Sequence, residues 1–91
     1  MTEPVQRRIA ELLRLDGAID WPDEFNGILD REGLNDLWNE VSQKCNATAQ
    51  QPLNGDADEW ERHQTLNTNR NVMFLSRLGL LELAKEHAVP A

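Results

Sequence analysis

Apolar side chains recur at helical spacing along most of this 91-residue chain, and this pattern constrains the fold most. Near the start, one helical face would carry Val5, Ile9, Leu12 and Leu13. There are 13 leucines, whereas tyrosine is absent and only seven residues are valine or isoleucine. Extended strands would find few packing partners, because they pack mainly through β-branched and aromatic side chains. We therefore predict an all-α protein, a single domain over residues 1–91 built from four to five short helices.

Two further apolar stripes predict helices over about 20–32 and 35–45. The first stripe consists of Trp21, Phe25, Ile28 and Leu29. Gly33 follows it and is expected to end that helix in a left-handed conformation. The second stripe consists of Leu37, Trp38, Val41 and Cys45. The spacing places Trp21, Trp38 and Cys45 in the core.

The second half of the chain is less regular. Its composition predicts a loop at about 46–56, followed by a fourth helix. The run from Asn67 to Asn71 predicts a turn, because short polar side chains compete for backbone hydrogen bonds. The last helix is expected at about 71–87, with Gly79 as a point where it could break. Whether residues 57–87 form one long helix or two is left open.

Acidic residues are concentrated in the middle of the chain. From Asp16 to Glu61 there are twelve acidic and two basic residues, a net charge of −10, within a total of −7. Such a surface attracts basic partners over long range and repels nucleic acid. Direct nucleic-acid binding is therefore not favoured, although a small DNA-binding regulator using the arginines of the first and last helices remains an alternative.

The favoured function is a non-enzymatic binding or regulatory protein whose acidic surface docks on a basic, nucleic-acid-binding protein. Trp60 would be an aromatic anchor with an acidic rim. The candidate partner-binding residues are Asp23, Asp30, Asp36, Glu40, Asp58, Glu59, Trp60 and Glu61. In size and charge the chain resembles inhibitors encoded by phages and mobile elements, a resemblance that assigns no residues. A solvated surface that only keeps the protein soluble is the plain alternative.

Self-association is a further alternative, because the last predicted helix is apolar on two sides. One side would meet a second copy of the chain in a homodimer. The candidate interface residues are Val72, Met73, Leu80 and Leu83.

The sequence offers no constellation for catalysis or metal binding. It has two histidines, one cysteine and no phosphate-binding loop, G-x-S-x-G or H-E-x-x-H motif. We therefore predict no enzymatic activity, no metal and no cofactor. A start without a secretory signal and the lack of a long apolar run predict a cytoplasmic protein with no membrane segment.

Overall fold

The structure, a computed structural model, describes the backbone of residues 1–47 and 56–88 and the side chains of residues 1–45 and 63–87. These residues form five helices: α1 (Glu3–Leu12), α2 (Pro22–Glu32), α3 (Asn35–Ala47), α4 (Asp56–Arg77) and α5 (Leu81–Ala88). In this part of the chain the only β pairing is one isolated bridge between Leu13 and Ile19. The predicted all-α fold is confirmed. Most of the predicted loop at about 46–56 lies outside the described residues.

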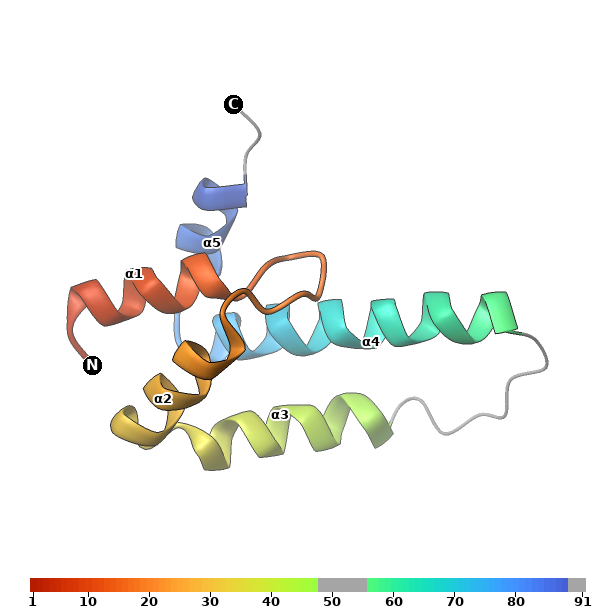
Figure 1. Cartoon of the computed structure of the whole chain (residues 1–91), viewed down its shortest axis with the longest axis horizontal. Coiled ribbons are helices and arrows are strands. Elements are labelled where there is room, and N and C mark those ends of the chain that lie inside the picture. The colour runs from red at the N-terminus through yellow and green to blue at the C-terminus, as the bar shows by residue number, and fades with distance from the viewer. Residues whose placement is uncertain (48–55, 89–91) are drawn as a thin grey trace.

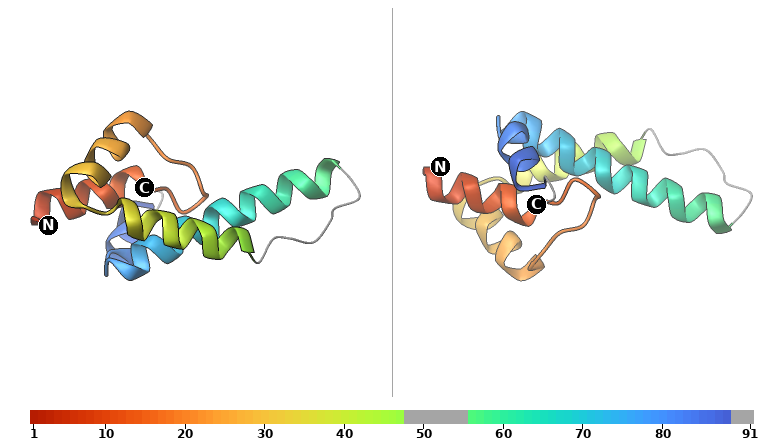
Figure 2. Two further views of the ribbon diagram at one scale, coloured as in Figure 1. Left: turned by 90° about the horizontal axis from the view of Figure 1, so that it is seen from below. Right: turned by 90° about the horizontal axis from the view of Figure 1, so that it is seen from above.

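α3 and α4 lie side by side and run antiparallel along the long axis of the molecule (Figure 1). α1 packs against α5 and α2, next to the C-terminal half of α4. The N-terminal half of α4 extends beyond this cluster (Figure 2). The molecule is consequently elongated, with extents of 44 × 34 × 22 Å.

Three aromatic rings form the centre of the core. Phe25, Trp38 and Phe74 come from α2, α3 and α4 and contact one another edge to face, with centroids 4.9 to 6.2 Å apart. Each such pair adds about 0.5–1.5 kcal/mol beyond the burial of its area. Buried aliphatic side chains surround the rings, among them Ile9, Leu12, Leu29, Val41 and Leu75. The predicted inward positions of Trp38 and Cys45 are confirmed.

The predicted core position of Trp21 is wrong. α2 begins at Pro22, and Trp21 precedes it with φ 48° and ψ 65°, in the left-handed region. The pyrrolidine ring of Pro22 disfavours the right-handed helical conformation for the residue before it. Trp21 therefore leaves the helical face that its spacing suggested, and its side chain is 68% exposed.

α2 ends as predicted. Gly33 has φ 68°, and the backbone N–H of Leu34 donates to the carbonyl oxygen of Leu29 over 2.9 Å. This 6→1 hydrogen bond satisfies a carbonyl in the last turn of the helix. Glycine takes the left-handed conformation at little cost because it has no Cβ.

The predicted turn at Asn67 to Asn71 is wrong, because α4 runs through this segment without interruption. The break falls instead at Gly79, which has φ 72°. There the Leu80 N–H donates to the Leu75 carbonyl over 2.8 Å, which closes a Schellman motif. The predicted last helix at about 71–87 is therefore two helices, the end of α4 and α5. Apart from Val72, the residues of the two apolar sides belong to the protein's own core or pack against it.

Candidate functional site

Trp21 is the most exposed large apolar side chain in the described part of the chain, at 68% against 47% for Met1. Among the described residues it is also the one non-glycine residue with a positive φ. Such a conformation costs on the order of 1–3 kcal/mol and persists only where the surroundings impose it. Because the indole contributes little to the core, its placement points to a role at the surface.

The loop of residues 13–21, which we call the Trp21 loop, is held by backbone hydrogen bonds at both ends. The N–H of Asp20 donates to the carbonyl of Leu12 over 2.8 Å, and that of Arg14 donates to Ala18 over 3.0 Å. The carbonyl of Trp21 itself accepts from the N–H of Phe25 at 3.1 Å, in the first turn of α2. The backbone that carries the indole is therefore ordered before any partner arrives.

Side chains in the C-terminal half of α4 hold this loop by hydrogen bonds and by close packing. Asn71 is fully buried, and its Nδ2 donates to the carbonyls of Arg14 at 2.9 Å and Ala18 at 3.1 Å. Gly17 lies directly against α4, where a Cβ would come within 2.8 Å of the Cβ of Asn67. Only a residue without a side chain fits this approach.

Arg70 completes the same hydrogen-bond network. Its Nε and one terminal nitrogen donate to Oδ1 of Asn71 at 3.2 and 3.1 Å, and that terminal nitrogen also reaches the Gly17 carbonyl at 3.4 Å. The guanidinium lies over the Trp38 ring at 4.9 Å, a cation–π contact. Burial lowers the pKa of Arg70, which nevertheless stays a cation. Arg70 and Asn71 thus lie within a helix and connect it to the Trp21 loop by hydrogen bonds.

Three acidic residues lie next to Trp21 in the sequence. Asp20 precedes Trp21, and Asp23 and Glu24 lie in the first turn of α2. Asp23 is exposed and takes part in no ion pair with another described residue. An exposed aromatic residue with acidic neighbours in the sequence has the composition of an interface anchor with a polar rim, although Asp20 and Glu24 also pair with Arg14 and Arg8.

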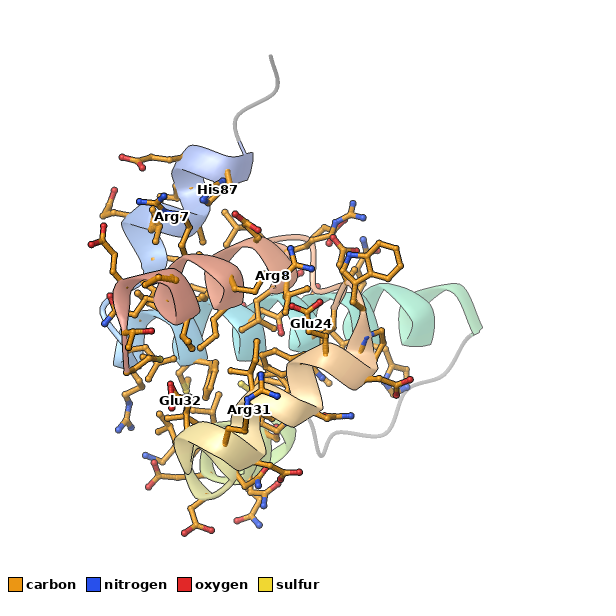
Figure 3. All side chains as sticks on the ribbon, turned by 60° about the vertical axis from the view of Figure 1, so that its left-hand side comes forward. Arg7, Arg8, Glu24, Arg31, Glu32 and His87 are labelled. Carbon is orange, nitrogen blue, oxygen red and sulfur yellow. The ribbon has the colours of Figure 1, made fainter. Side chains whose placement is uncertain are left out.

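Glu24 is held by Arg8, which reaches across from α1 (Figure 3). The two groups form two parallel hydrogen bonds of 2.5 and 2.8 Å, and Arg8 also donates to Glu11 at 3.0 Å. The hydrogen bonds from Arg8 lower the pKa of Glu24, and those from Arg8 to both carboxylates raise the pKa of the arginine. The fork geometry fixes the start of α2 relative to α1.

Other carboxylates predicted to bind a partner are more dispersed. Asp30 accepts a hydrogen bond from Nδ2 of Asn35 at 2.6 Å, and Asp36 is exposed on α3. Glu40 lies 3.8 Å from Arg77 and 4.0 Å from Lys44, so its charge is partly compensated. The remaining predicted residues belong to α4, but their side chains lie outside the described part: Asp58, Glu59, Trp60 and Glu61.

None of the four residues predicted for a homodimer interface is fully exposed. Leu80 is buried at 5% exposure, and Met73 and Leu83 pack against the core. Val72 is half-buried. The homodimer stays a prediction, and the apolar surface that it would use is small.

The arginines of α1 and of the residues that follow it form ion pairs within the molecule. Arg7 lies 3.4 Å from Glu3, Arg8 binds Glu24, and Arg14 lies 2.6 Å from Asp16. Arginines already paired with carboxylates neutralise fewer phosphates. The geometry gives the DNA-binding alternative no added support.

No metal-binding group of three or more ligating side chains lies within the described residues. Among the described helices, none combines the length and apolarity that crossing a bilayer requires. Comparisons with protein-family models, with characterised proteins and with solved structures found no match for this chain. Its function must therefore be inferred from its own geometry.

Trp21 is the functional candidate that the sequence analysis missed. The apolar spacing over residues 20–32 assigned it to the core, together with Phe25. The contrary signal was Pro22, since a proline in the first helical turn places the preceding residue outside the helix.

Proposed function

We propose that this chain is a non-enzymatic regulatory protein that binds a basic protein through the Trp21 surface, defined as Trp21, Asp20, Asp23 and Glu24. The observation that supports this function most is the 68% exposure of an indole whose backbone is held in a left-handed conformation. Tryptophans are enriched among the few interface residues that carry most of the binding energy. A loop that is already ordered loses little conformational entropy on binding.

Charge selects the kind of partner. The segment from Asp16 to Glu61 carries a net charge of −10, and the Trp21 surface lies within it. Complementary charge raises the rate of encounter and disfavours acidic partners. A partner with a basic rim around an apolar pocket would match both the carboxylates and the indole.

Such binding would inhibit the partner by covering the surface with which it binds nucleic acid. Proteins that bind nucleic acid present lysines and arginines that neutralise phosphates. An acidic protein seated on those cations would exclude the nucleic acid from the same surface. The proposed partner is therefore a basic, nucleic-acid-binding protein, as the sequence analysis expected.

Affinity capture from a lysate of the native host tests this function. Wild-type protein, Trp21→Gly and Trp60→Ala would be immobilised separately, and the retained proteins quantified by mass spectrometry. We expect a basic protein that the wild type retains and Trp21→Gly loses, and that added duplex DNA releases from the wild type, while retention by Trp60→Ala shows whether Trp60, also a predicted anchor, takes part. Equal retention by all three proteins would contradict the claim that Trp21 binds the partner. Loss with Trp60→Ala alone would show that Trp60 of α4 binds the partner instead of Trp21.

Self-association is the second candidate, supported by one feature. A depression of about 470 Å³ between α3 and α4 is lined partly by Val72 and Met73, two of the predicted interface residues. Sedimentation at micromolar concentration separates the two functions. A monomer of 10.4 kDa removes self-association.

A further inference from the structure

A groove of about 400 Å³ lies beside the Trp21 surface, between the C-terminal end of α1, the Trp21 loop and α5. Its apolar lining consists of the half-buried Leu15 and of Ala10, Leu13 and Ala84, which are at most 3% exposed, and His87 of α5 also lines it (Figure 3). Its acidic lining residues are Glu11, Asp16 and Asp20. Apolar walls with carboxylates suit a side chain that has an aliphatic stem and a cationic end.

The protein's own Arg14 shows that a guanidinium fits between these carboxylates. One of its terminal nitrogens lies 2.6 Å from Oδ2 of Asp16, and the other lies 3.8 Å from Oδ1 of Asp20. The second oxygen of Asp16 accepts the backbone N–H of Ala18 at 3.0 Å, so this carboxylate is held in place. Arg14, Asp16 and Asp20 have side chains that are 52%, 46% and 46% exposed.

We propose that this groove, which we call the Arg14 groove, receives an arginine or lysine side chain of a basic protein partner, which displaces Arg14 from Asp16 and Asp20. The proposal rests on the proposed function and names the chemistry of the contact next to Trp21. Asp20 joins the two features, since it lines the groove and immediately precedes Trp21. A partner cation in the groove would therefore lie next to the indole anchor.

Exchange of one cation for another is favoured by the exposure of the internal pair. Exposed ion pairs contribute little to stability because water and salt screen them. Arg14 loses little when it turns into solvent, whereas the partner's cation also gains contact with the apolar lining. Asp16 and Asp20 are paired with Arg14 in the free protein and with the partner's cation in the complex, so neither state leaves these carboxylates without a cation. Arg14 thus acts as an internal competitor for the groove.

This competition gives the proposal its test. The probe is a fluorescein-labelled six-arginine peptide, titrated by anisotropy at one fixed, low ionic strength. Arg14→Gln removes the competitor, and Arg7→Gln is its matched control because it makes the same charge change at an arginine that pairs with Glu3 outside the groove. We expect Arg14→Gln to bind the peptide about threefold to fivefold more tightly than Arg7→Gln, the range open to an exposed ion pair.

A second pair of variants examines the carboxylates themselves. Asp20→Asn should weaken peptide binding, whereas Glu3→Gln, which removes a charge outside the groove, should weaken it less. Thermal melts show whether each variant is folded. The side chain of Arg14 can be changed without losing the buried contact to Asn71, because that contact uses the Arg14 backbone carbonyl.

The outcomes separate this proposal from the function on which it rests. Equal affinities for Arg14→Gln and Arg7→Gln would overturn the Arg14 groove, as would equal effects of Asp20→Asn and Glu3→Gln. If Trp21→Gly still abolished binding of a captured basic protein, the proposed function would stand without the groove. If the peptide bound none of the variants and no basic protein were captured, both would fail.

Discussion

The buried side chain of Asn71 donates a 2.9 Å hydrogen bond to the backbone carbonyl of Arg14, 57 residues earlier in the chain. The same amide reaches the carbonyl of Ala18 at 3.1 Å. The middle of α4 thereby fixes both sides of the Trp21 loop. A polar residue within a long helix determines where an exposed tryptophan is presented.

Replacing Asn71 with alanine should destabilise the protein by about 1–3 kcal/mol, because two side-chain hydrogen bonds are lost and each contributes about 0.5–1.5 kcal/mol. The Arg14 and Ala18 carbonyls would each lose one hydrogen bond and would keep the one that each accepts from a backbone N–H of the loop. Urea unfolding measures the change, and Asn69→Ala is the control because Asn69 is exposed on the same helix. Equal effects of the two substitutions would show that the buried hydrogen bonds contribute nothing measurable.

Gly17→Ala should cost more than Gly33→Ala, although both glycines have a positive φ. At Gly17 a Cβ would also lie 2.8 Å from the Cβ of Asn67, whereas at Gly33 no atom lies within 4 Å. We expect about 1–2 kcal/mol for Gly33→Ala from backbone conformation alone, and a larger loss for Gly17→Ala. Chemical denaturation of both variants tests this, and a smaller loss at Gly17 would contradict the close contact with α4.

Trp21→Gly and Trp38→Ala should differ widely in stability. Glycine relieves the left-handed strain at position 21 while it gives the unfolded chain more freedom, so we expect the free energy of unfolding to stay within about 1 kcal/mol. Trp38 contacts Phe25, Phe74 and Arg70, so its loss should cost about 3–5 kcal/mol. Thermal melts provide the comparison. A large loss of stability in Trp21→Gly would mean that the indole has a structural role.

The Arg8–Glu24 pair should make stability depend on pH in the acid range. Hydrogen bonds from Arg8 hold the pKa of folded Glu24 below its ordinary value of 4.5. The pair therefore stabilises the fold above the unfolded pKa, and this contribution is lost as pH falls through the folded pKa. The difference in denaturation midpoint between wild type and Glu24→Gln should shrink from pH 7 to pH 3, and also at 1 M salt. A difference that is constant with pH would contradict this account.

Local rules were sufficient for much of the fold. Apolar spacing identified the helices of the first half, and Gly33 marked the end of α2 because its left-handed conformation is a property of glycine itself. The placement of Trp38 and Cys45 toward the core also followed from their spacing alone.

Errors arose where distant contacts override local preference. The polar run from Asn67 to Asn71 is helical, and two of its side chains, Arg70 and Asn71, hydrogen-bond the Trp21 loop, which no local window includes. The last predicted helix is divided at Gly79 into two helices, so its apolar residues do not share one helical wheel. The candidate site was found only in part: the acidic segment was recognised, but the exposed indole within it was not. Its position depends on Pro22 and on the loop.

The affinity of the purified basic partner for Trp21→Gly, compared with wild type and Trp60→Ala, tests the docking role of Trp21 most directly. Calorimetric titration at physiological salt gives all three dissociation constants under one condition. A hot-spot tryptophan contributes at least about 2 kcal/mol, so Trp21→Gly should bind about thirtyfold more weakly or worse, and the constant of Trp60→Ala gives the separate contribution of Trp60. A Trp21→Gly variant that binds with wild-type affinity would contradict the account.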